Sequence, residues 1–146
     1  MNNNNIETFT VIDYHYEPFS YSIWTLKHEK LCITPFKCAE QLGIYNATIA
    51  STGYIKGKIG LDLSTVSVCK DYNKLPFSII ENNFNKSDGS VVRALGKAKN
   101  IDELNHRFEL ESLIDFFIEP ENWLSIADGD FVEVIGILKF KPHQNP

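Results

Sequence analysis

The stretch GDFVEVIGILKF, residues 129–140, decides the fold class of this chain. It follows Asp128, and an Asp-Gly pair is typical of tight turns. The β-branched and aromatic residues that come next favour extended backbone. A run of this composition, bounded by a turn, predicts a β-strand that closes the domain.

The same strand pattern recurs along most of the sequence. Residues 6–16 and 19–26 are rich in aromatic and β-branched side chains, and Glu17-Pro18 separates them. This arrangement predicts a hairpin with its turn at the proline. Further strands are expected at residues 31–33, 44–68 and 77–80.

Residues 100–119 allow two interpretations. Asn100 and Glu103 form a capping box, which would start a helix. The apolar residues of this segment, however, fall on two opposed faces of such a helix, so neither face could be buried alone. We therefore favour β-strand for residues 106–118.

Two short helices are expected between the strands. Pro35 suits the first position of a helix over residues 36–42, and Gly43 would end it. Residues 120–124 resemble a single helical turn. The predicted fold class is mainly β, an α+β chain with few short helices, built as an antiparallel β-barrel or sandwich.

Residues 90–140 resemble most of an OB-fold in the order of their elements. The first strand carries Gly96, and the second and third strands lie at residues 108–110 and 116–118. A short helix then leads into the closing strand. The resemblance implies a five-stranded barrel. Its fifth strand would have to come from another part of the chain, such as the N-terminal half.

Length and composition fit one folded domain. The chain has 146 residues, of which 43% are hydrophobic and 23% charged, so it can bury one core. Asn2 to Asn5 form a polar run with nothing to bury, which predicts a disordered tail at residues 1–5 and a single domain over residues 6–146. Residues 82–89 form the clearest loop and are a candidate boundary between two substructures.

Cysteine usage and hydropathy indicate a cytoplasmic protein. Cys32, Cys38 and Cys69 are an odd set without C-x-x-C spacing, which favours reduced, buried thiols over disulfides or a zinc site. A run of about 18 apolar residues, as needed to cross a membrane, is absent from the sequence. The first 25 residues lack the layout of a secretory signal. We expect a cytoplasmic location without membrane contact.

Negative charge is concentrated in the second part of the chain. Residues 1–87 balance eight lysines with eight acids, whereas residues 88–146 carry six basic residues against eleven acids, which gives the whole net charge of −5. Between residues 102 and 133, ten acids are opposed only by Arg107. Such a segment either keeps a protein soluble or steers a basic partner. The candidate partner-binding residues are Asp102, Glu103, Glu109, Glu111, Asp115, Glu119 and Glu121.

Two short motifs are better explained by structure than by ligand binding. Residues 53–60 are glycine-rich, but Ile59 stands where a phosphate-binding P-loop needs serine or threonine, so a bent strand is the preferred interpretation. Asp128 and Asp130 flank Gly129 as in some metal loops, yet the other ligand positions of a calcium loop are missing. We expect a turn there, no metal site and no cofactor.

The histidines do not indicate an active site. Asp13 could orient His15 on one strand face, and Asp102 could orient His106 if that segment were helical. Neither pair has a companion nucleophile, so we expect no catalytic residue. An active site assembled from distant residues stays open as an alternative. The histidines are His15, His28, His106 and His143.

Aromatic side chains near the start of the chain support an alternative function. OB-type surfaces bind single-stranded nucleic acid by stacking bases on aromatic rings. Such binding also needs lysine or arginine near the phosphates, and this chain has no basic cluster. The competing interpretation is that these rings fill a core. The candidate stacking residues are Tyr14, Tyr16, Phe19, Tyr21 and Trp24.

The first function hypothesis is a non-catalytic binding protein whose acidic face masks a basic protein. In size and charge the chain is similar to the immunity proteins that neutralise bacterial toxin nucleases, and that resemblance implies a toxin nuclease as partner. The second hypothesis is an OB-type protein that binds single-stranded nucleic acid. The third is an enzyme with an unrecognised site. None of them fixes the oligomeric state.

Overall fold

The regular structure of this protein consists of β-strands. The computed structural model describes residues 6–15, 22–40, 53–71, 73–81 and 89–143, and all the regular elements in these ranges are strands. The strands are β1 (Glu7–His15), β2 (Ile23–His28), β3 (Cys32–Glu40), β4 (Tyr54–Val68), β5 (Phe77–Glu81), β6 (Val91–Asp102), β7 (Arg107–Glu111), β8 (Asp115–Pro120) and β9 (Phe131–Pro142).

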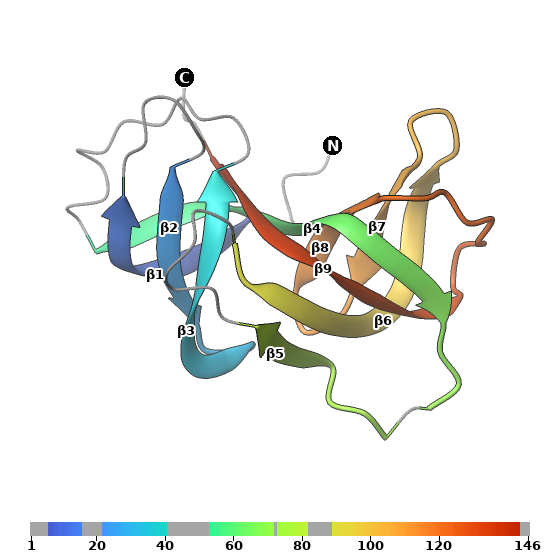
Figure 1. The fold of residues 1–146 in the computed structure, drawn as a ribbon, viewed down its shortest axis with the longest axis horizontal. Helices are drawn as coiled ribbons and strands as arrows, with labels where there is room; N and C mark the ends of the chain where they lie inside the picture. Colours follow the sequence, from blue (N-terminus) through green and yellow to red (C-terminus); the bar gives the residue numbers. More distant parts are fainter. Residues whose placement is uncertain (1–5, 16–21, 41–52, 72, 82–88, 144–146) are drawn as a thin grey trace.

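Two long strands, β4 and β9, form the centre of the molecule. They pair antiparallel from Gly57 opposite Pro142 to Val68 opposite Val132, with one irregularity between Asp62 and Thr65. Figure 1 shows this ribbon running along the molecule, with β1 to β3 around one end and β6 to β8 around the other. Each end of the ribbon therefore belongs to a different set of strands.

The strands at each end close into a ring. At one end, β1 pairs with β2 and β4, β2 with β3, and β3 with β9, and these strands form what we call the N-terminal barrel. At the other end, β6 pairs with β7 and β9, β7 with β8, and β8 with β4, which gives the C-terminal barrel. β5 adds to the edge of β6. The two barrels share β4 and β9.

Both rings have the pairing order of an OB-type barrel. Three consecutive strands pair antiparallel, and the third lies parallel to a strand contributed by the shared ribbon: β3 to β9, and β8 to β4. The expected fifth strand of the C-terminal barrel does come from the N-terminal half, because β4 supplies it. In turn, β9 completes the N-terminal barrel, so each half closes the barrel of the other.

One hydrophobic core runs through both barrels. In the N-terminal barrel, Trp24 and Phe9 meet the ring of Phe140 edge-on, at centroid distances of 5.6 and 5.5 Å. From β5, Phe77 contacts Phe36 in the N-terminal barrel and stacks on Phe116 in the C-terminal barrel, 5.9 Å between centroids. The two barrels are therefore joined by packing of aromatic side chains as well as by the strands that they share.

A glycine allows β4 and β8 to approach closely. A Cβ atom on Gly60 would lie 2.2 Å from the ring of Phe117, its partner across the strands. Side chains larger than glycine would push this ring away from the sheet. Residues 54–60 of the glycine-rich run belong to β4, as predicted, and Gly53 lies just before the strand.

The fold class is confirmed as mainly β, with barrel architecture. The parallel pairs β3–β9 and β4–β8 make the sheet mixed rather than purely antiparallel. The hairpin of the first two strands and strand structure within residues 106–118 are also confirmed, so the helix that the capping box suggested is wrong. The turn at Asp128-Gly129 is present, and Gly129 has a φ of +92°.

Both expected helices are wrong in the described residues. Residues 35–40 belong to β3, where Phe36 and Cys38 are fully buried opposite β2. Pro35 fits the strand because β3 pairs with β9 only at Ala39 and Glu40, so its missing N–H breaks no bond to β9. Residues 120–124 end β8 and enter a loop without helical structure.

Several predictions concern parts of the chain that the structure does not describe. These are the tail at residues 1–5, the turn at Glu17-Pro18, the strand before residue 53, and residues 82–88 of the candidate boundary. In the described ranges, no helix is long and apolar enough to cross a membrane.

Candidate functional site

The outer side of β7 and β8 carries alternating charged residues. Phe108, Leu110, Phe116 and Ile118 point into the barrel and are almost completely buried. Because side chains alternate along a strand, the residues between them face outward. These outward residues are Arg107, Glu109 and Glu111 on β7, and Asp115, Phe117 and Glu119 on β8.

Two carboxylates lie directly opposite each other on this side. Glu111 on β7 pairs in register with Asp115 on β8. Like charges in this position destabilise a sheet. Lys99 from β6 offsets part of the repulsion with an ion pair to Asp115, 3.1 Å between Nζ and Oδ2. Glu111 itself is exposed, and Lys97 lies opposite it on β6.

Further carboxylates lie at the β6–β7 turn and just after β8. Asp102 ends β6, Glu103 is exposed in the turn, and Glu121 is exposed just after β8. Hydrogen bonds from the Asn105 amide and backbone hold the pKa of Asp102 below its usual value. Positive charge is present beside these carboxylates too, because Arg107 forms an ion pair with Glu119, 3.9 Å between Nε and Oε2.

An aromatic pair anchors this hairpin to the loop after β8. The rings of His106 and Trp123 stack almost in parallel with centroids 5.1 Å apart, and the Trp123 indole donates a hydrogen bond to Glu103, 3.2 Å. His106 has a φ of +55°, an uncommon value for a residue other than glycine. Beside it, Leu104 is 89% exposed. This part of the site was not predicted from the sequence.

The seven predicted partner-binding residues lie on β7 and β8 and beside the ends of these strands in the C-terminal barrel, and we call them the acidic face. They occupy the end of β6, the hairpin, β7, β8 and the residue after it. A hollow of about 210 Å³ lies within this face, between the side chains of Asp102, Glu109, Glu119 and Lys141. Basic residues are interspersed, since Lys97, Lys99 and Arg107 lie on the same strands. The acidic face is Asp102, Glu103, Glu109, Glu111, Asp115, Glu119 and Glu121.

The two predicted stacking residues that the structure describes, Tyr14 and Trp24, do not form an open aromatic surface. Trp24 is completely buried, and its indole donates a hydrogen bond of 2.9 Å to the buried carboxylate of Glu40. Tyr14 packs against Trp24, 4.2 Å between ring centroids. For Trp24 the core-filling interpretation holds. Tyr16, Phe19 and Tyr21 lie outside the described residues.

Other candidate chemistry resolves into structural contacts. The carboxylate of Asp130 accepts a hydrogen bond from the backbone of Ala127 and so closes the turn, and His28 pairs with Glu7 at 2.9 Å. The described residues contain no group of three or more side chains suited to a metal ion. Cys38 and Cys69 are free and buried, and burial raises the pKa of the Cys38 thiol.

Comparison of the chain with protein-family models, with curated proteins and with solved structures finds no match. The functional argument therefore rests on the residues of the acidic face and on their geometry.

Proposed function

We propose that this protein is a non-catalytic binding protein whose acidic face binds and masks a basic protein. In this respect it would act as immunity proteins and other protein inhibitors do. The single observation that carries the proposal is the placement of four carboxylates on the outward side of β7 and β8, with three more beside the ends of these strands. Such a concentration steers a cationic partner toward one orientation.

The cost of the arrangement supports a binding role. Glu111 opposite Asp115 is an unfavourable pair for a sheet, and a solubilising surface would not need it. The exposed Leu104 and the half-buried Trp123 place apolar surface beside the carboxylates. Apolar side chains surrounded by polar ones are the usual anatomy of a protein interface.

Binding of single-stranded nucleic acid is less well supported. In OB-type barrels the surface of the second and third strands takes the ligand, and in the C-terminal barrel those strands are β7 and β8. Glu109, Glu111, Asp115 and Glu119 face outward there, so phosphates would be repelled. The third hypothesis is an enzyme with a site assembled from distant residues, and the acidic face gives it no support.

A lysine peptide provides a direct test. The ¹⁵N-labelled protein is titrated with Ac-Lys-Lys-Lys-NH₂ at low salt, and amide shifts are followed by NMR. We expect the shifts to be confined to β7, β8 and the β6–β7 hairpin. Raising the salt to about 0.3 M should weaken binding strongly, because screening shortens the range of the attraction.

Matched variants separate the acidic face from general acidity. The double variant Glu111→Gln/Glu121→Gln removes two exposed acids of the face, and Glu29→Gln/Glu81→Gln removes two exposed acids elsewhere. The first should weaken peptide binding several-fold and the second should leave it unchanged. Equal losses, or shifts spread over both barrels, would refute the proposal.

A further inference from the structure

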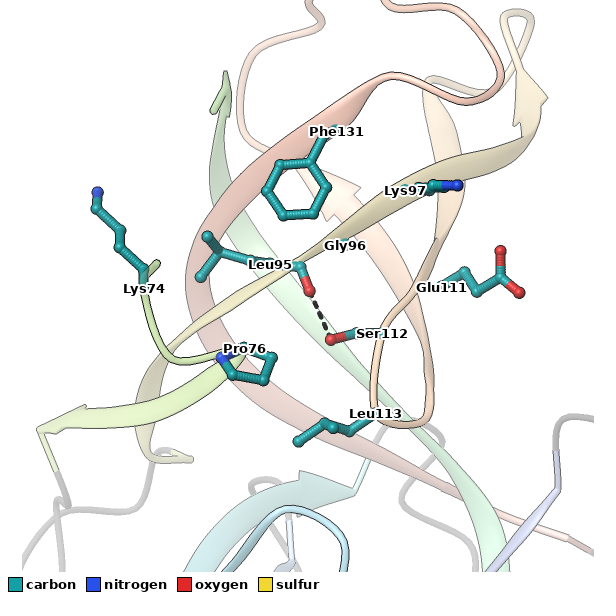
Figure 2. Close-up of a pocket in the computed structure, with 9 residues that line it drawn as sticks. All are labelled: Lys74, Pro76, Leu95, Gly96, Lys97, Glu111, Ser112, Leu113 and Phe131. Carbon is teal, nitrogen blue, oxygen red and sulfur yellow. Dashed lines mark hydrogen bonds between the residues drawn. The ribbon is translucent and has the colours of Figure 1, made fainter. Parts of the chain in front are cut away.

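A groove beside the acidic face has the character of an apolar binding site. It has a volume of about 480 Å³, within the range of ordinary ligand pockets, and Pro76, Leu95, Leu113 and Phe131 form its apolar walls. These residues come from the segment before β5, from β6, from the β7–β8 turn and from the start of β9. Figure 2 shows them around one opening.

The walls of the groove are held in place before any ligand arrives. Ser112 donates a hydrogen bond of 2.5 Å to the carbonyl of Leu95, which ties the β7–β8 turn to β6. The Leu95 amide donates to the carbonyl of Pro76, 2.9 Å. A Cβ on Gly96 would lie 2.1 Å from the carbonyl oxygen of Glu111, so a larger residue would not fit here without movement of the backbone. A preformed site loses little entropy on binding.

The charged rim connects the groove to the acidic face. Glu111 belongs to both, and Asp115 is its partner on β8. On the opposite rim Lys74 forms an ion pair with Glu133, 3.3 Å away, and this carboxylate also lies 3.6 Å from Arg93. The remaining rim charge is Lys97, across the strands from Glu111. A cationic group that approaches Glu111 would therefore bring its neighbouring side chain over the groove.

We propose that this groove receives an aromatic side chain of the basic partner, next to a cationic residue that pairs with Glu111. The inference rests on the proposed function and adds an anchor to it. Aromatic residues that fill a pocket beside charged rims supply much of the affinity of protein interfaces. The apolar walls and the volume fit such a ring, and the carboxylate on the rim fits the charge next to it.

Three blocked peptides test the anchor separately from the acidic face. Ac-Lys-Trp-Lys-NH₂, Ac-Lys-Lys-Lys-NH₂ and Ac-Gly-Trp-Gly-NH₂ are each titrated into the labelled protein. We expect Lys-Trp-Lys to shift the amides of Leu95, Leu113 and Phe131 and to bind about fivefold to tenfold more tightly than either other peptide. The variant Leu113→Gln should remove this gain, since Leu113 is 41% exposed and lines the groove. The matched control Ile12→Gln, at 51% exposure on β1, should keep it.

The other outcomes each overturn a different statement. Equal affinity for Lys-Trp-Lys and Lys-Lys-Lys would refute the anchor and leave the acidic face in place. Binding of Gly-Trp-Gly as tight as that of Lys-Trp-Lys would identify a site for apolar molecules unrelated to the basic partner. Concentration-dependent shifts of the groove amides without peptide would identify a second copy of the chain as occupant. Failure of both lysine peptides would refute the proposed function and the anchor with it.

Discussion

The two barrels have the same pairing order but different contents. The N-terminal barrel is filled with large rings, among them Phe9, Trp24 and Phe140. It also contains the buried hydrogen bond from Trp24 to Glu40. The C-terminal barrel holds two rings, Phe108 and Phe116, among smaller side chains such as Val92, Ala94 and Val134, and carries the acidic face outside. Backbone pairing thus specifies the architecture, while function depends on what each barrel places on its surface.

The largest expected effect tests whether the barrels unfold together. Phe116→Ala empties part of the C-terminal core and should cost about 3–5 kcal/mol. In a Trp123→Phe background, Trp24 is the remaining tryptophan and reports on the N-terminal barrel. Because the barrels share β4 and β9, its fluorescence midpoint in urea should fall together with the far-UV circular dichroism.

A Trp24 midpoint unchanged by Phe116→Ala would show that the N-terminal barrel is stable without its neighbour. The exposed substitution Ile12→Ala is the control, and it should alter the free energy of unfolding by no more than about 0.5 kcal/mol.

The next largest loss of stability is expected when a glycine of the C-terminal barrel is replaced. Gly96→Ala would place a Cβ 2.1 Å from the carbonyl oxygen of Glu111, and the backbone would have to move. We expect a loss of about 3 kcal/mol in urea unfolding, the upper end for overpacking. In Gly129→Ala the new Cβ would meet nothing within 4 Å, so only the positive φ would lower the free energy of unfolding, by about 1 kcal/mol. Similar losses for the two variants would mean that β6 and β7 adapt easily.

Local sequence signals predicted most of the strands but not their partners. The composition of residues 129–140 sufficed for β9, and the resemblance of residues 90–140 correctly required a fifth strand from elsewhere. Its identity could not be predicted, because Leu61 and Leu138 pair across a long separation that leaves no local pattern. The helix expected over residues 36–42 failed for the same reason: pairing of β3 with β2 outweighed the proline and glycine signals.

The candidate site was predicted in part. The excess of acids is visible in the sequence, and strand alternation explains why Glu109, Glu111, Asp115 and Glu119 face one way. Cross-strand register then places Lys97 and Lys99 among them, which composition cannot reveal. The groove was missed because its walls come from four separate segments.

A lysine paired with the acidic face should affect stability and binding in opposite directions. Lys99→Gln removes the ion pair to Asp115, in which both side chains are partly exposed, and should cost about 0.5 kcal/mol of unfolding free energy. The same change makes the face more negative, so the lysine peptide should bind more tightly. Lys27→Gln in the N-terminal barrel is the control and should leave binding unchanged. Weaker peptide binding to Lys99→Gln would indicate that Lys99 positions the face.

The smallest effect concerns the hairpin at the end of the acidic face. Two hydrogen bonds from Asn105 lower the pKa of Asp102, so the folded protein favours the charged carboxylate. This contribution to stability is present above the unfolded-state pKa and is lost as the pH falls through the lowered value. An NMR titration of the carboxyl carbon should give a pKa below the usual aspartate value, and Asn105→Ala should raise it. The N-terminal barrel takes no part in this contact. If the pKa of Asp102 were unchanged in Asn105→Ala, the hydrogen bonds of the hairpin alone would not set the charge of Asp102.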